Sequence, residues 1–298
     1  MSSICLSFVF NHQYEKNIPK LKKIYGERFS TIKFLSPFSD WNKDEAIIPI
    51  FETSIHFQGY FSQAYPLLPK DYDYYVFCAD DLLLNPSLNE DNLINELRCK
   101  DSGYIKYLNP IWEHSFAWHK FEECNSFPST DNIIPYSQYL PGRDELLMKY
   151  EALGFNFRNI GMHNFFGVYQ KGITTDRLWA GIKYVIRNGL KRYVHYPLME
   201  GYSDFIVVPK ENLKVFCYYC GIFAAMNLWV DAAVATSLIL SCDKIANEEQ
   251  HNYKGIELWN NEDVYNQTRL AGGKVNNLKN IFSENTLYIH PVKLSSFN

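Results

Sequence analysis

The sequence YYVFCADDLLLNP, from Tyr74 to Pro86, decides the fold of this chain. Its opening residues are bulky and apolar, which is typical of a strand buried on both faces of a sheet. Two acids, Asp80 and Asp81, follow this strand directly, and an apolar run then resumes. In open α/β sheets the ligand crevice lies outside the carboxyl ends of the strands. The sequence therefore predicts a binding site at this acidic pair.

Strand and helix patterns alternate on both sides of this segment. We expect strands at Ser3–Phe10, Thr31–Leu35, Ile47–Phe51, Asp204–Pro209 and Leu287–Pro291, and helices at Tyr14–Phe29, His56–Leu68, Asp144–Leu153, Asp176–Asn188 and, as one long buried helix, Gly221–Cys242. This alternation predicts an α/β protein with an open mixed sheet flanked by helices. The 298 residues are interpreted as one domain, 1–298, with a mainly helical or irregular insertion at about 102–192.

Composition excludes some classes of protein. Apolar residues make up 47% of the chain and the formal net charge is −4, so a large core is expected and a basic nucleic-acid-binding surface is not. The seven Cys residues are odd in number, and most stand in apolar runs, which favours reduced thiols in a reducing compartment. Cys217 and Cys220 have CxxC spacing, but no second pair completes a zinc site.

The apolar stretch Val215–Leu240 is long enough to span a bilayer. Asn227 and Asp231 lie near its middle, and an acid at the centre of a bilayer costs about 2.5–3.5 kcal/mol or more. We therefore expect a buried helix carrying a functional carboxylate, with a membrane-embedded protein as the alternative. No signal peptide is evident at the N-terminus.

Acids at the end of a central strand are placed to hold a hard cation such as Mn²⁺ or Mg²⁺, which neutralises a diphosphate leaving group. The alternative for Asp80 and Asp81 is a solvated turn in which an Asp caps a helix. A second element, LYIHPVKLS at Leu287–Ser295, supplies an imidazole at His290 and an ammonium at Lys293. Neutral imidazole binds transition metals and an ammonium binds phosphate.

The acidic segment resembles the DxD motif of glycosyltransferases with the GT-A fold, which lies at the end of a central strand. CADD departs from the strict motif because Cys78 or Ala79 replaces one acid, and this leaves open which of Asp80 and Asp81 is the direct metal ligand. The resemblance implies that Asp80, Asp81 and His290 bind the metal and that Lys293 lies beside the diphosphate. It covers about residues 3–95 and 200–295.

The same resemblance implies roles for further residues. Asp231, in WVDAA, matches the general base of inverting members, and Asp204 is the alternative acceptor-contacting acid; Asp231 paired with a cation or capping a helix is the structural alternative. The residues expected to bind the donor are Phe10, Asn11, His12, Ser36, Gln63, Asp80 and Lys293. In a retaining enzyme Asp231 would instead orient the acceptor.

The implied reaction moves a hexose from a UDP-sugar, or less favourably a GDP-sugar, to a hydroxyl of a bacterial surface glycan or lipid-linked glycan. We expect a cytoplasmic protein without a nucleic-acid partner, and peripheral association with the inner face of the cell membrane is left open. Two alternatives remain at this stage. One is a non-catalytic nucleotide- or sugar-binding protein with a degenerate transferase fold, and the other is a nucleotidyltransferase.

Overall fold

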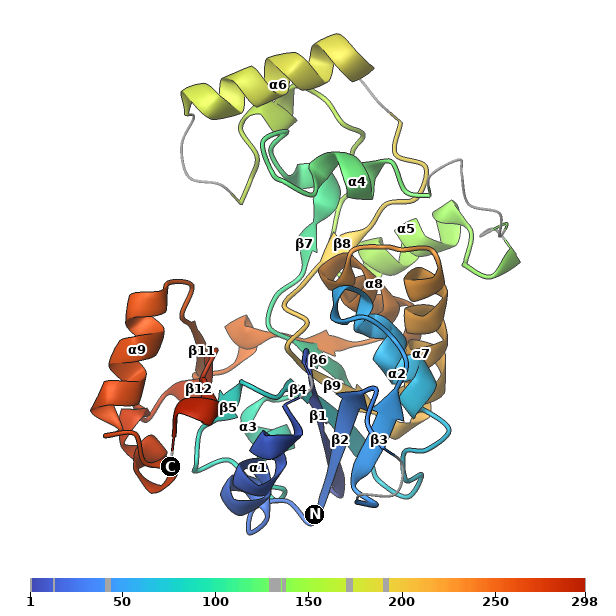
Figure 1. Ribbon diagram of the computed structural model, residues 1–298. Helices are drawn as coiled ribbons and strands as arrows, with labels where there is room; N and C mark the ends of the chain where they lie inside the picture. The colour runs from blue at the N-terminus through green and yellow to red at the C-terminus, as the bar shows by residue number, and fades with distance from the viewer. Residues whose placement is uncertain are drawn as a thin grey trace.

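The computed structural model describes residues 2–12, 14–40, 44–128, 135, 138–169, 174–189 and 193–297 (Figure 1). The fold is α/β with a seven-stranded mixed sheet, an arrangement compatible with a Rossmann-like fold. In spatial order the strands are β3 (Ile47–Ile50), β2 (Thr31–Pro37), β1 (Ile4–Val9), β4 (Tyr74–Ala79), β9 (Phe205–Pro209), β6 (Gly103–Ile105) and β10 (Ile245–Ala246).

The predicted strand after residue 73 is confirmed as β4, which lies in the middle of this sheet. β4 pairs in parallel with β1, in a register that places Ala79 opposite Val9, and pairs antiparallel with β9, in a register that places Cys78 opposite Phe205. The ends of β1 and β4 and the start of β9 therefore meet at one edge of the sheet. The residues that follow Val9 and Ala79, and those that precede Phe205, are brought together there.

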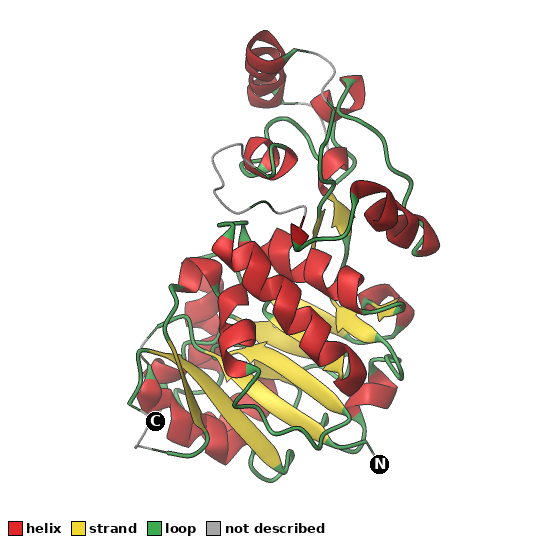
Figure 2. Ribbon diagram, turned by 90° about the vertical axis from the view of Figure 1, so that its right-hand side faces the viewer, coloured by secondary structure: helices red, strands yellow, loops and turns green. Residues whose placement is uncertain are grey.

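Alternate residues of β4 pack against helices on opposite faces of the sheet (Figure 2). On one face the ring of Phe77 lies 4.6 Å from that of Phe61, in helix α2 (Gln58–Ala64). On the other face Val76 belongs to the core that contains Leu21 and Tyr25 of helix α1 (Ile18–Tyr25). The first face is covered by α2 (Gln58–Ala64), α7 (Lys210–Ala225) and α8 (Val230–Ser241), and the second core includes residues of α1 (Ile18–Tyr25) and α3 (Leu93–Glu96).

The prediction of one long helix at Gly221–Cys242 is wrong, because two helices occupy this region. α7 ends at Ala225 and α8 begins at Val230. Between them Asn227 has a φ of 54°, a left-handed conformation that ends a helix and that Asn adopts more readily than most residues. Among the described residues, no helix is both long enough and apolar enough to cross a membrane.

A second sheet of three strands contains His290, one of the predicted site residues. β12 (Thr286–His290) lies between β11 (Lys254–Glu257), which is parallel to it, and β5 (Leu83–Leu84), which is antiparallel. The predicted strand at Leu287–Pro291 thus corresponds to β12, shifted by one residue. The described elements outside the two sheets and the lobe also include α9 (Asn261–Leu270) and the short 3₁₀ helices η1 (Glu15–Asn17), η2 (Ser54–His56), η6 (Glu248–Gln250), η7 (Val275–Ile281) and η8 (Leu294–Ser296).

Residues between β6 and β9 form a lobe that stands away from the seven-stranded sheet (Figures 1 and 2). Its neck is a two-stranded ribbon of β7 (Asn109–Pro110) and β8 (Met199–Glu200), and it contains η3 (Ile111–Glu113), α4 (Phe121–Asn125), α5 (Arg143–Ala152), η5 (Met162–Phe165) and α6 (Thr175–Asn188). β6 belongs to the central sheet, so the lobe begins after Ile105 and not at residue 102.

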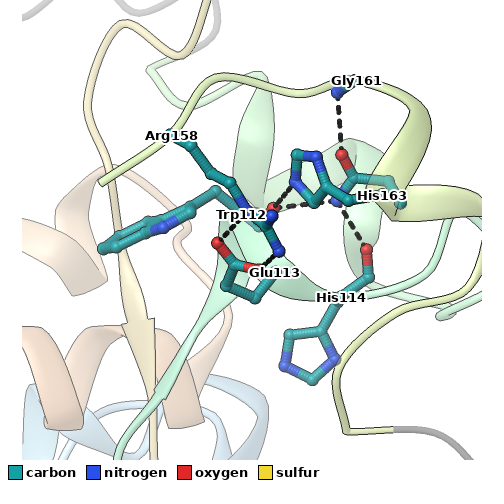
Figure 3. Close-up of polar contacts among 7 residues, drawn as sticks. Trp112, Glu113, His114, Arg158, Gly161 and His163 are labelled. Atoms are coloured by element: carbon teal, nitrogen blue, oxygen red, sulfur yellow. Dashed lines mark hydrogen bonds and ion pairs between the residues drawn. The ribbon is translucent and has the colours of Figure 1, made fainter. Parts of the chain in front are cut away.

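Polar side chains hold the irregular segments of the lobe together (Figure 3). The buried amide of Asn164 donates to the carbonyl oxygens of Trp112 and His114, at 2.8 and 2.7 Å. Nε of Arg158 lies 2.6 Å from the carboxylate of Glu113, and a second guanidinium nitrogen contacts its other oxygen. The bonds from Asn164 satisfy two backbone carbonyl groups, and together with the pair of Arg158 and Glu113 they fix the path of the lobe after its neck.

Candidate functional site

Asp80 is the first residue after β4, and its carboxyl is buried at the edge of the sheet. Its backbone N–H donates to Val9 at 3.1 Å, and its side chain accepts from the backbone N–H of Asn11. Only 6% of Asp80 is exposed. Burial, followed by the charge of Asp81, raises the pKa of Asp80 to about 7. A cation bound beside Asp80 would stabilise its ionised carboxylate and so lower this pKa.

Asp81 and His290 are in direct contact. Nε2 of His290 lies 3.0 Å from Oδ1 of Asp81, and Nδ1 of the same ring lies 2.6 Å from the hydroxyl of Tyr202. Burial alone would lower the pKa of His290, but the hydrogen bond with Asp81 and the charges of Asp204 and Asp81 raise it above its usual value. The imidazole is therefore held on both sides, and its orientation is fixed.

Backbone pairing explains why His290 returns to Asp81. The apolar residues Leu83 and Leu84 of β5 pair with Ile289 and Tyr288 of β12, only two residues after the acidic pair. Beyond the strand, the backbone N–H of Val292 donates to the carbonyl of Asp81 at 2.6 Å. Two short apolar runs, far apart in the sequence, thus bring the predicted acid and imidazole together.

The tail after β12 also closes one side of a cavity. Lys20 of α1 donates to the carbonyl oxygen of Leu294 at 2.9 Å, which fixes the tail against the N-terminal part of the fold. The cavity has a volume of about 240 Å³. It is lined by Asn11, His12, Tyr14, Asn17, Asp80, Asp81, Val292, Lys293, Leu294 and Ser295. Four of the seven predicted donor-binding residues, Asn11, His12, Asp80 and Lys293, are therefore in its wall.

Asp204 and Asp231 extend the acidic site toward the neck of the lobe. The hydroxyl of Ser203 donates to Oδ1 of Asp231, which lies in the first turn of α8. Burial, and after it the charges of Asp204 and Glu200, raise the pKa of Asp231 to about 7, against the opposing effect of Ser203. The pKa of Asp204 is raised to about 6, mainly by burial. The charge of His290 opposes this shift, and the charge of Asp81 adds to it.

Asp204 is therefore coupled electrostatically to both Asp81 and Asp231. The charge of Asp81 raises the pKa of Asp204, and the charge of Asp204 raises the pKa of Asp231. Asp204 and Ser203 also line a narrow slot against the ends of β1 and β4, together with Val9, Asn11, Phe57, Cys78 and Ala79. Three acids with raised pKa values at one sheet edge can hold a cation or exchange a proton near neutral pH.

Three predicted donor-binding residues lie outside the cavity wall. Phe10 is fully buried, and its ring packs 6.2 Å from that of Phe34, so this ring has no face to offer to a nucleobase. Ser36 is buried and accepts a hydrogen bond from Ser39 at 2.6 Å. The side-chain oxygen of Gln63 accepts from the backbone N–H of Phe51 at 2.8 Å, so it supports the end of β3.

Sequence reasoning missed Tyr202, Ser203, Tyr14 and Asn17. Tyr202 and Ser203 directly precede the predicted acid Asp204, and this adjacency is the signal that could have found them. Tyr14 and Asn17 follow the end of β1 in the same way. A contact such as that between Tyr202 and His290 depends on the pairing of distant segments, which local sequence patterns do not reveal.

The donor atoms present fit a hard divalent cation whose remaining ligands come from a substrate. Within the described part of the chain, no group of three or more His, Cys, Asp and Glu side chains is arranged to hold a metal ion. Mg²⁺ is usually bound through one or two carboxylates together with the phosphates of a substrate. Asp81 and Asp80 could supply such carboxylates, and His290, whose Nδ1 lies beside the hydroxyl of Tyr202, could supply a nitrogen ligand.

A scan of known protein families finds no family model that matches this chain, and a search of curated proteins finds no matching sequence.

Proposed function

We propose that this chain is a glycosyltransferase that takes a hexose from a UDP-sugar and transfers it to a hydroxyl of a bacterial surface glycan. The observation that carries the proposal is the contact between Asp81 and His290 beside a cavity that Asn11, His12 and Lys293 also line. An acidic pair after a central strand, joined by a distant imidazole, is the arrangement that the resemblance to GT-A enzymes implies.

In this proposal Asp81, Asp80 and His290 would hold Mn²⁺ or Mg²⁺ only together with the diphosphate of the donor, since among the described residues these side chains are not arranged as a metal site by themselves. The cation, when bound, neutralises the negative charge that develops on the departing diphosphate. Lys293 is exposed at the cavity wall and adds a positive charge there. Asn11 and His12, at the end of β1, contribute polar groups for the nucleoside, while Tyr202 keeps the imidazole in its orientation.

Asp231 is proposed as the group that accepts the proton of the acceptor hydroxyl in an inverting transfer. A pKa of about 7 suits a general base, because such a carboxyl is partly ionised at neutral pH and still binds a proton effectively. Ser203 orients this carboxylate, and Asp204 is the alternative acid at the same edge. In a retaining transfer Asp231 would orient the acceptor. The anomeric configuration of the product distinguishes these roles.

The test is a screen of nucleotide sugars for Mn²⁺-dependent hydrolysis, since slow transfer to water reports the donor without an acceptor. UDP-hexoses should be preferred, and Asp81→Asn should abolish UDP release. Asp71→Asn is the matched control, because Asp71 is exposed just before the opposite end of β4. Reaction with only GDP- or CMP-sugars would contradict the assigned donor.

Two other outcomes identify the alternatives. Mn²⁺-dependent UDP binding without turnover, even with glycan acceptors supplied, would indicate a non-catalytic binding protein. Pyrophosphate release from UTP and a sugar phosphate would indicate a nucleotidyltransferase.

A further inference from the structure

Helix α6 presents its apolar face to solvent. Leu178, Trp179, Ile182 and Ile186 are spaced so that they share one side of the helix, and all four are exposed, Trp179 by 61% and Ile186 by 81%. In a helix of a globular protein such a stripe normally faces the core. Here the stripe faces solvent, so packing within this chain does not account for it.

The inner side of α6 explains how the helix is seated on the lobe. Tyr184 stacks on Phe116 with ring centroids 4.5 Å apart. Gly181 faces Phe165 so closely that a Cβ atom would lie 2.5 Å from the ring. Tyr184, Gly181 and the partly buried Val185 thus seat the helix on the lobe, and the four residues of the stripe are not part of this cluster.

The position and charge of the helix point to the kind of partner. α6 lies at the end of the lobe farthest from the seven-stranded sheet (Figures 1 and 2). It carries Arg177, Lys183 and Arg187 against one acid, Asp176. Lys183 and Arg187 are exposed beside the apolar stripe, and Arg187 lies 3.4 Å from Glu122 of the lobe.

We infer that α6 docks the protein on an anionic lipid bilayer, with its apolar stripe in the headgroup region and its basic side chains at the lipid phosphates. Such binding combines burial of apolar side chains with attraction to anionic lipid. A 14-residue helix is about 21 Å long, and one exposed face of it is small compared with the ~800 Å² that each partner buries in a stable protein dimer. A symmetric pair of α6 helices would also bring two helices of net positive charge together.

The inference is tested by sedimentation of the full chain with vesicles of phosphatidylcholine and phosphatidylglycerol, compared with phosphatidylcholine alone. We expect binding to the anionic vesicles. In Ile186→Glu this binding should be reduced by about tenfold or more, because a charge replaces an aliphatic side chain that the bilayer would bury. Trp259→Glu is the matched control, since Trp259 is 76% exposed outside the lobe and should leave binding unchanged.

Three outcomes would overturn this inference. They are absence of binding to both kinds of vesicle, an equal loss in Trp259→Glu, and self-association of the wild-type chain that Ile186→Glu abolishes without any vesicle binding. The last result would assign the stripe to contacts between copies. Equal thermal melting curves for the variants show that the fold is retained. The readout does not use catalytic turnover, so it is independent of the proposed glycosyl transfer.

Discussion

The imidazole of His290 is held between Asp81 and Tyr202, with Nε2 3.0 Å from the carboxylate and Nδ1 2.6 Å from the phenol oxygen. The acid and the imidazole are 209 positions apart in the chain. Each ring nitrogen has one polar neighbour, so the orientation of the ring depends on both.

Tyr202→Phe should weaken Mn²⁺-dependent UDP binding by about 10- to 100-fold, because partners of a metal-binding His orient its ring. Isothermal titration with UDP and Mn²⁺ measures this effect. Tyr288→Phe is a close control: its ring lies parallel to that of Tyr202 at 5.7 Å, and among the described residues its hydroxyl has no hydrogen-bond partner. Equal losses in the two variants would show that the contact between the hydroxyl of Tyr202 and His290 has no specific role in binding.

Asp231→Asn should reduce turnover by about 10²–10⁴-fold if Asp231 is the general base. In the wild-type protein kcat/KM should rise with pH and reach half its maximum near pH 7, because only the ionised carboxyl accepts a proton and its pKa is about 7. This limb should disappear from the residual activity of the variant. A pH profile that is the same in both proteins would assign the titration to another group, with Asp204 the next to be substituted.

The same carboxyl should also make stability depend on pH. Its pKa is raised from 3.8 to about 7 on folding, so the folded protein binds the proton more tightly than the unfolded chain does. The free energy of unfolding should therefore fall as pH rises from about 4 through about 7 and then level off. Asp80 and Asp204 act in the same direction.

Asp231→Asn should remove its part of this decrease, so the variant should gain roughly 1–3 kcal/mol relative to the wild type between acidic and mildly alkaline pH, after allowance for the partial exposure of the residue. Urea unfolding at about pH 5 and about pH 8 measures the difference. Asp71→Asn, at an exposed position, should follow the wild type. A parallel shift of Asp231→Asn at both pH values would mean that its pKa is not raised.

Gly201→Ala tests the segment that carries Tyr202, Ser203 and Asp204. A Cβ atom at Gly201 would lie 2.5 Å from the side chain of Ile105 and 2.6 Å from the backbone oxygen of Tyr107. We expect a loss of about 1–3 kcal/mol in unfolding free energy, because a backbone oxygen cannot move as a flexible side chain does. Gly142→Ala is the control, with no atom within 4 Å of its Cβ position, and it should be nearly neutral.

The parts of the fold that sequence patterns predicted are those determined by local composition. β4 was expected at its observed bounds, because six apolar residues end abruptly in two acids. The break between α7 and α8 was not expected, since apolar residues continue through it and neither Gly nor Pro marks it. Its position depends on the left-handed conformation of Asn227, which tertiary packing selects.

The site was predictable to a similar extent. Asn11, His12 and Asp80 share a cavity wall because they follow the ends of the neighbouring strands β1 and β4, a regularity of α/β sheets, whereas Lys293 reaches the same wall from the segment after β12 of the second sheet. Gln63 was placed near the donor from its position before β4, but its side chain bonds to the backbone of Phe51, at the end of β3. The direction of a helical side chain is set by the strand that packs beside it, and this information is not local.

The cavity wall combines residues that are far apart in the sequence. Asn11 and His12 are synthesised early, and residues 292–295 follow more than two hundred positions later. During translation the acidic pair is therefore present long before the segment that covers it. A chain still attached to the ribosome, with its tail inside the exit tunnel, has the central sheet residues but an unfinished site. Under the proposed function, a half-made chain that has not reached His290 would therefore lack a complete donor site.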